Sequence, residues 1–305
     1  MPHHKVSNYE AHVRSLMAAC AWIGIDRGRA AQYGLLIRQF FEGAERSREH
    51  ILAYNESCEI TEIYKLWQAN IDNFPNLDKK IRAVFSGGPI LREDEKSHTS
   101  SNRARNDAFV YLLAGMLIRA GVSVVAVNGS LSKHARCKSE ADITFDWNGS
   151  VIDVECKRPQ TPVTIQKRVK EAYQQLTRPE RLGRPGVIGL DCSAFIRPPG
   201  TVIEKDSAEE AEAFLGELLE TAVMREITAH LKPSILGFIL FARAPAMTRK
   251  GHSTILSPDG TPLQRYFRPE SISTTLVVNN SNSSDDQMLR TVFQMLSQKV
   301  SDLDF

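Results

Sequence analysis

Hydrophobic residues recur every three to four positions through the first part of the chain, and this spacing predicts helices. The repeat is clearest at Leu16, Ala19, Cys20 and Ile23. Runs with the same spacing cover 35–40 and 60–71, and a polar stretch follows at 92–102. We therefore expect residues 1–97 to form a helical region, packed as a separate layer or domain, and residues 98–305 to form a second one. Dimerisation and gripping of a substrate both remain open as roles for the first region.

After this stretch, helical and alternating patterns follow one another. A helix is predicted over 100–120, where Gly121 fits the position after its C-terminus. Strands are predicted at 122–127, 142–147 and 151–157, followed by an amphipathic helix over 165–176 and a strand at 187–191. The predicted order is thus α-β-β-β-α-β, which indicates an α/β (α+β) fold.

The last third of the chain continues with the same alternation. Ser207 and Glu210 have the spacing of a capping box and predict a long helix that ends before Pro233. Strands are predicted at 235–242 and 274–278, and a final helix at 285–300. We expect a C-terminal αββα extension.

Asn148 and Gly149 separate two stretches in which apolar and polar residues alternate. Asn-Gly favours a two-residue type I′ hairpin turn, because both central residues of that turn have positive φ. A two-residue turn fixes the register of the two strands. Trp147 then faces Ser150, and Asp142 faces Glu155.

One face of this predicted hairpin is apolar, and the other carries Asp142, Thr144, Asp153, Glu155 and Lys157. Carboxylates that face each other across two strands are destabilising, so Asp142 and Glu155 need a compensating partner. A divalent cation is such a partner, because Mg²⁺ takes oxygen ligands and commonly uses one or two carboxylates together with substrate phosphate. Lys157 points to the same place, where it can position an attacking water. The alternative is a solvated hairpin with a charged outer face.

Asp142 followed by Glu155, Cys156 and Lys157, within the α-β-β-β-α-β order, resembles the PD-(D/E)XK nuclease superfamily. The resemblance covers roughly residues 100–195. It implies a restriction-endonuclease-like core with a mixed sheet, and a Mg²⁺ or Mn²⁺ cofactor bound by Asp142 and Glu155. It also implies that Lys157 completes the catalytic site. Ala141 stands where the family often has proline.

The same resemblance suggests two further site residues. Some members have an acidic metal ligand on the first core helix, and Asp107 is the candidate for it here. Others place a glutamine or tyrosine of the second core helix at the active site. Gln166, in the first turn of that helix, is the candidate for this catalytic position, and Gln174 and Gln175 lie further along it.

Basic residues gather beside the hairpin. From Lys157 to Arg184 the chain has eight basic and two acidic residues. Lys and Arg bind nucleic-acid phosphates without reading the base sequence, so this patch predicts nucleic-acid contact. An ordinary solvated helix face is the alternative. The candidate nucleic-acid-binding residues are Lys133, Arg136, Lys138, Arg158, Lys167, Arg168 and Lys170.

Composition narrows the class of protein without identifying it. The 305 residues are 42 % apolar and 24 % charged, as in ordinary globular proteins, and the net charge of +2 does not by itself indicate nucleic acid. No apolar run reaches the 18 residues typical of a membrane span, and the first residues lack an apolar leader. The five cysteines are scattered, with no CxxC pair to indicate zinc or redox chemistry. We expect reduced thiols, a cytoplasmic location and no membrane partner.

Together these features predict a Mg²⁺- or Mn²⁺-dependent nuclease that hydrolyses phosphodiester bonds, with DNA as the expected substrate. Restriction or phage defence ranks first among its contexts, by frequency alone. The alternative is a non-catalytic nucleic-acid- or protein-binding module that retains the fold, although all three central site residues are present. DNA or RNA, endonuclease or exonuclease, and monomer or homodimer remain open.

Overall fold

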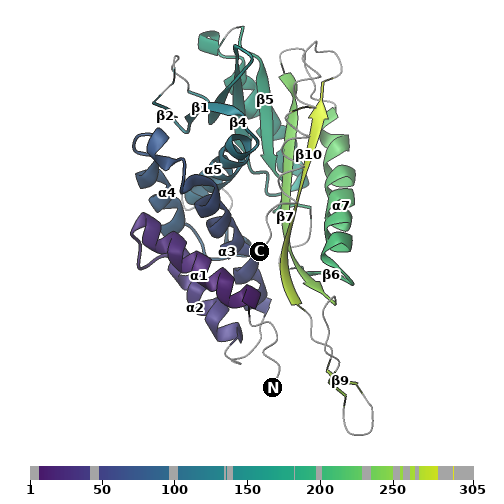
Figure 1. The fold of residues 1–305 in the computed structure, drawn as a ribbon. Helices are drawn as coiled ribbons and strands as arrows, with labels where there is room; N and C mark the ends of the chain where they lie inside the picture. Colours follow the sequence, from purple (N-terminus) through teal and green to yellow (C-terminus); the bar gives the residue numbers. More distant parts are fainter. Residues whose placement is uncertain are drawn as a thin grey trace.

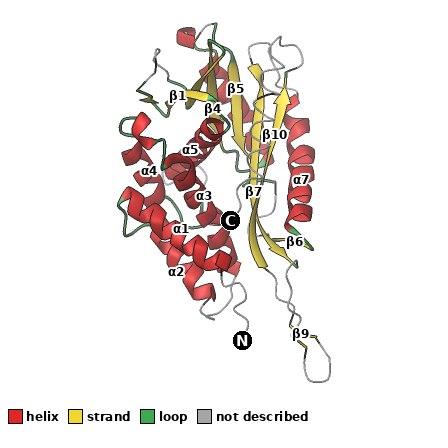
Figure 2. Cartoon of the chain, in the orientation of Figure 1, coloured by secondary structure: helices red, strands yellow, loops and turns green. Residues whose placement is uncertain are grey.

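The computed structural model describes residues 7–41, 48–95, 102–133, 135, 140–181, 183–196, 201–228, 235–249, 255–256, 262–264, 268–280 and 291. These residues form an α/β fold around an open, mixed sheet, with helices on both of its faces (Figures 1 and 2). The strands follow the order β10-β7-β5-β4-β3-β1-β2 across the sheet, and β6 pairs with β7 outside this path. No helix in the described part of the chain is both long and apolar enough to cross a membrane.

The bounds of the elements agree closely with the pattern of apolar residues. The helices are α1 (Ser7–Ile23), α2 (Arg29–Phe41), α3 (Arg48–Trp67), α4 (Leu77–Ser86), α5 (Arg103–Arg119), α6 (Pro162–Leu176) and α7 (Ala208–Thr228). The strands of the main sheet are β1 (Ser123–Val127), β2 (Ser130–Leu131), β3 (Ile143–Trp147), β4 (Ser150–Lys157), β5 (Gly186–Asp191), β6 (Ile203–Lys205), β7 (Ile235–Thr248) and β10 (Arg268–Asn279). The short strands β8 (Ile255–Leu256) and β9 (Pro262–Gln264) form a separate pair.

The two faces of the sheet belong to two different hydrophobic cores. On one face, α1 to α5 pack against apolar residues of β1, β3 and β4, such as Phe145, Ile152 and Val154. On the other face, α6 and α7 pack against Ile188 and Leu190 of β5 and against β7. The N-terminal helices are thus a layer that shares one continuous core with the sheet. Figure 1 shows α1 to α4 grouped on one side of the molecule.

The predicted β3–β4 hairpin is confirmed. Trp147 pairs with Ser150, and the register continues to Ile143 opposite Val154. Asn148 and Gly149 have φ values of 52° and 85°, as a type I′ turn requires. A second Asn-Gly turn, at Asn128 and Gly129, joins β1 to β2, and our sequence analysis did not identify it.

The C-terminal strands are longer than predicted. β7 and β10 pair with each other as an antiparallel ladder from Arg268 opposite Thr248 to Asn279 opposite Gly237. The backbone N–H of Glu210 donates to Ser207 Oγ over 3.2 Å, in agreement with the predicted cap of α7. The helix predicted over 285–300 lies outside the described residues, apart from Thr291.

Arg92, the first residue of the polar stretch that predicted a domain boundary, contacts both parts of the chain. It lies in the 3₁₀ helix Arg92–Asp94 and is buried. Its guanidinium lies 3.2 Å from Glu56 Oε1 and 2.9 Å from Glu59 Oε2 on α3, and 3.1 Å from Asp191 Oδ2 at the end of β5. A charged side chain is therefore part of the contact between the helical layer and the sheet.

Removal of Arg92 should destabilise the whole fold. Arg92→Met leaves Glu56, Glu59 and Asp191 buried without the cation they share. Loss of one partner from a buried ion pair costs about 3–5 kcal/mol. We expect a decrease of that size in the free energy of unfolding, measured by urea denaturation at pH 7. Arg249→Met is the control, because Arg249 pairs with Asp206 at an exposed site, and a loss below about 1 kcal/mol is expected there. Similar losses in the two variants would contradict the central role of Arg92.

Candidate active site

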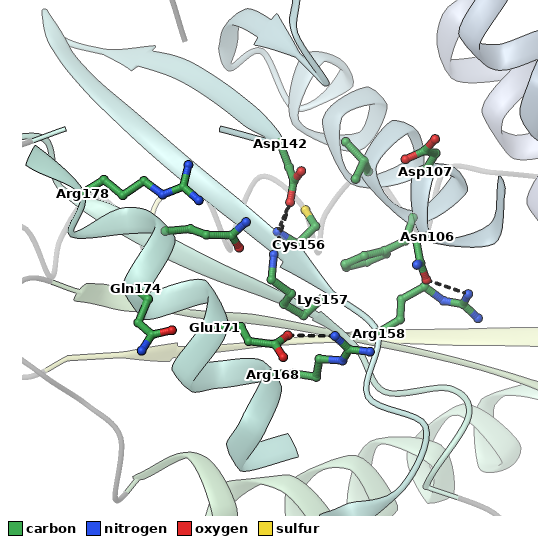
Figure 3. Close-up of a pocket in the computed structure, with 13 residues that line it drawn as sticks. Asn106, Asp107, Asp142, Cys156, Lys157, Arg158, Arg168, Glu171, Gln174 and Arg178 are labelled. Carbon is green, nitrogen blue, oxygen red and sulfur yellow. Dashed lines mark hydrogen bonds and ion pairs between the residues drawn. The ribbon is translucent and has the colours of Figure 1, made fainter. Parts of the chain in front are cut away.

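A cavity of about 470 Å³ lies where β3 begins and β4 ends, between α5 and α6 (Figure 3). Pockets of this size are typical of small-ligand and substrate sites. Its lining comprises Asn106, Asp107, Phe109 and Val110 of α5, Asp142 before β3, Cys156, Lys157 and Arg158 around the end of β4, and Arg168, Glu171, Gln174, Gln175 and Arg178 in and after α6. Charged and amide side chains thus form most of the lining, together with the apolar side chains of Phe109 and Val110.

Asp142 and Lys157 line this cavity, while Glu155 does not line it and is buried in contact with Lys157. Lys157 Nζ lies 3.1 Å from Glu155 Oε2 and 3.8 Å from Asp142 Oδ2. The backbone N–H of Cys156 donates to Asp142 Oδ2 over 2.8 Å, and this bond fixes the Asp142 carboxylate beside the end of β4. Figure 3 shows Asp142 and Lys157 directed toward one another.

Burial makes this pair of carboxyl groups electrostatically unfavourable. The side chain of Asp142 is 30 % exposed, and that of Glu155 only 2 %. Burial and the neighbouring charge of Glu155 raise the pKa of Asp142 to about 6, although Lys157 and the Cys156 N–H act in the opposite direction. Near neutral pH the site therefore holds a carboxylate whose ionisation is costly, which is a feature common at functional sites.

The donor set is compatible with a divalent cation that has few protein ligands. No group of three His, Cys, Asp or Glu side chains suited to a metal is present within the residues that the structure describes. Mg²⁺ is often bound through only one or two carboxylates, with waters and substrate phosphate as its other ligands. Asp142 and Glu155 could supply those carboxylates, and a cation beside Asp142 would offset the repulsion that raises its pKa.

Asp107 lines the same cavity from the α5 side. Its carboxylate lies 3.8 Å from Arg103 Nε, and burial raises its pKa above the ordinary value. Asn128, whose backbone N–H donates to the Asp142 carbonyl over 2.7 Å, also contacts Asp107 through its side chain. The turn between β1 and β2 thus links the two acids, while a metal-binding role for Asp107 remains a prediction.

The structure does not bring Gln166 to the cavity. Gln166 is exposed, and its Nε2 donates to Glu226 Oε2 of α7 over 3.1 Å. The residues of α6 that line the cavity are Arg168, Glu171, Gln174 and Gln175, and Gln166 is not among them. Gln175 Oε1 is buried and accepts no hydrogen bond from the described residues. Helical periodicity could have favoured Gln175 over Gln166.

The basic candidates differ in burial. Arg158 lines the cavity but is buried, and it donates to Asp191 Oδ2 over 2.9 Å and to Glu95 Oε1 over 3.0 Å, so its guanidinium already has partners inside the protein. Lys167 and Lys170 are exposed on α6, and Lys133 is exposed after β2. Arg168 lines the cavity and pairs with Glu171 at 2.8 Å. Arg136 and Lys138 lie outside the described residues.

Most of the polar face of the hairpin is buried, in contrast to the solvated face that was the alternative, and Asp142 and Lys157 are partly exposed on it. Thr144, Asp153 and Glu155 are all buried, and Thr144 Oγ1 donates to Asp153 Oδ1 over 2.7 Å. Arg181 Nη1 donates to Glu155 Oε1 over 2.7 Å, a contact that our sequence analysis did not predict. Arg181 is 26 positions from Glu155 in the sequence, and no local pattern pairs the two residues.

Comparisons with protein-family models, with curated proteins and with solved structures found no match to this chain. The function must therefore be inferred from the chemistry of the cavity. Two adjacent carboxyl groups, one lysine and a set of arginine and amide side chains suit a phosphate-bearing substrate together with a cation.

Substitution of Asp142 should stabilise the protein in a pH-dependent way. The raised pKa means that ionised Asp142 destabilises the fold fully above about pH 6, and that this cost disappears below the ordinary value of 3.8. Asp142→Asn keeps an oxygen for the Cys156 N–H and removes the charge. We expect a gain of about 1–3 kcal/mol in the free energy of unfolding at pH 8 and little or no gain at pH 4, measured by urea denaturation.

Asp146→Asn is the matched control, because Asp146 lies on the same hairpin and its carboxylate accepts the Gly149 N–H at the exposed turn. This variant should show no gain at pH 8. A loss of stability in Asp142→Asn at both pH values would contradict the unfavourable charge at this site.

Proposed function

We propose that this chain is a metal-dependent nuclease that hydrolyses phosphodiester bonds, with DNA as the expected substrate. The observation that carries the proposal is the position of Lys157 Nζ, 3.8 Å from Asp142 Oδ2 and 3.1 Å from Glu155 Oε2, in a cavity that Asp142 and Lys157 line. The raised pKa of Asp142 beside this cavity supports the proposal, because shifted pKa values are common at functional sites.

The arrangement of the elements supports a PD-(D/E)XK type of core. The order α5, β1, β3, β4, α6, β5 corresponds to α-β-β-β-α-β, with the two-residue strand β2 added after β1. β3 pairs in antiparallel fashion with β1 and β4, and β4 pairs in parallel with β5. Asp142 and Lys157, at the start of β3 and the end of β4, line the cavity together with residues of both helices of this core, and Glu155 is buried in contact with Lys157.

Each residue then has a chemical role. Asp142 and Glu155 would hold Mg²⁺ or Mn²⁺, which when bound lowers the pKa of water and offsets charge on phosphate. Lys157, whose side chain is 14 % exposed, orients an attacking water or a phosphate oxygen through its ammonium hydrogens. Arg168 and Arg178 lie on the α6 side of the cavity, where guanidinium groups can bind phosphate oxygens.

One observation favours a second candidate function. Both oxygens of Glu155 already have cationic partners, Arg181 at 2.7 Å and Lys157 at 3.1 Å. In a non-catalytic nucleic-acid- or protein-binding module, these groups would be a structural ion-pair network with no need for a metal. The nuclease requires a divalent cation for cleavage, whereas the binding module needs none. Cleavage assays with and without the cation therefore distinguish the two functions.

Glu155→Gln should abolish cleavage without unfolding the protein. We expect the full-length wild type to cleave nucleic acid with Mg²⁺ or Mn²⁺ and to lose this activity in EDTA. Single-stranded DNA, duplex DNA and RNA serve as parallel substrates. In Glu155→Gln the rate should fall at least about 100-fold, because the variant lacks one of two carboxylate ligands. Circular dichroism checks the fold, and a filter assay checks that nucleic acid is still bound.

Glu180→Gln is the control, since it makes the same change at an exposed residue beside the site. Its rate should equal that of the wild type. Absence of metal-dependent cleavage from the wild type on all three substrates, combined with a lower melting temperature in Glu155→Gln, would reject the nuclease and favour the binding module.

A further inference from the structure

The two carboxylate oxygens of Glu155 face different partners. Oε1 accepts a hydrogen bond from Arg181 Nη1 over 2.7 Å, on the side of the chain that leads from α6 to β5. Oε2 accepts one from Lys157 Nζ over 3.1 Å, and the same ammonium is 3.8 Å from Asp142 Oδ2 beside the cavity. One oxygen is thus directed into the protein, and the other toward the candidate active site.

Arg181 is held firmly in place. It ends the 3₁₀ helix Pro179–Arg181, and its side chain is only 5 % exposed. Its backbone N–H donates to the Arg178 carbonyl over 2.9 Å, and its carbonyl accepts the Arg184 N–H over 3.0 Å. A charge-assisted bond from a fixed guanidinium restricts the rotation of the carboxylate that it contacts.

We infer that Arg181 is a positioning residue for the active site, an inference that rests on the proposed function. By holding Oε1, it turns the Glu155 carboxylate so that Oε2 faces Lys157, Asp142 and the cavity. Glu155 then offers one oxygen, not two, to a divalent cation beside Asp142. Residues that orient a metal ligand in this way commonly affect metal affinity about as strongly as activity.

Arg184 provides a matched comparison from the same turn. Its Nη1 lies 3.8 Å from Asp153 Oδ2, and Arg181 Nε lies 3.9 Å from the same oxygen. Both arginines therefore pair with Asp153, and Arg181 Nη1 in addition donates to Glu155 Oε1 over 2.7 Å. If Arg181 only balanced the charge of Asp153, substitution of Arg181 and substitution of Arg184 would change Mn²⁺ affinity to a similar extent.

The test measures Mn²⁺ binding by isothermal titration calorimetry on the full chain, alongside kcat and KM for cleavage. Mn²⁺ binding that is lost in Glu155→Gln is assigned to the candidate active site. In Arg181→Met, Mn²⁺ affinity should fall about 10–100-fold, and kcat should fall while KM for nucleic acid stays near the wild-type value. Arg181→Lys, which keeps the charge but not the planar guanidinium, should restore part of the affinity. Arg184→Met should bind Mn²⁺ as the wild type does.

Each outcome decides a separate point. Wild-type Mn²⁺ affinity in a folded Arg181→Met protein overturns the role of Arg181. If Arg181→Met does not fold, the comparison passes to Arg181→Lys: weaker Mn²⁺ binding than Arg184→Met supports the inference, and equal binding overturns it. Mn²⁺ binding without cleavage by the wild type overturns the proposed function alone, while absence of Mn²⁺ binding overturns both.

Discussion

The buried ion pairs around Asp191 are the constraint on which the geometry of the site depends. Asp191 ends β5 and contacts both Arg92 and Arg158, and Arg158 directly follows Lys157 in the chain. Although burial alone would raise the pKa of Asp191, the two guanidinium groups and the Ser193 hydrogen bonds lower it far below the ordinary value. The carboxylate therefore stays ionised and bound across the whole working pH range. Because it fixes Arg158, it also fixes the end of β4, from which Lys157 extends into the cavity.

The same network explains why the N-terminal helices matter to a site that they do not line. Arg158 contacts Glu95 and Asn106, and Arg105, one position before Asn106, contacts Glu56 on α3. α3 thus holds α5 against the end of β4, so that Asp107 and Phe109 form one wall of the cavity. The helical layer is better described as the support of this wall than as an independent domain, since the two parts share a core and a set of buried charges.

The sequence predicted the parts of the fold that interactions between neighbouring residues determine. Asn148 and Gly149 fixed a turn, the turn fixed the register, and the register brought Asp142 to Glu155. The sequence did not predict contacts between residues that are distant in the chain. Examples are the contacts of Arg181 with Glu155, of Arg92 with Asp191 and of Gln166 with Glu226. Charged residues in a polar stretch look alike whether they meet water or a buried partner, because their burial is decided by tertiary packing. For this reason the segment around Arg92 resembled a linker, and the internal ion pairs of Arg158 were not predicted.

The Arg92 cluster and the group of charges at the cavity act on their carboxyl groups in opposite directions. In the Arg92 cluster, arginines outweigh the cost of burial and lower the pKa of Glu56 to about 2. At the cavity, burial and a second carboxylate prevail, and the pKa of Asp142 rises to about 6. The first cluster gains stability from its charges at neutral pH, while the second loses stability in the absence of a further cation. A carboxylate that costs stability beside a cavity, in contrast to the stabilising carboxylates around Arg92, is in keeping with the cation site proposed above.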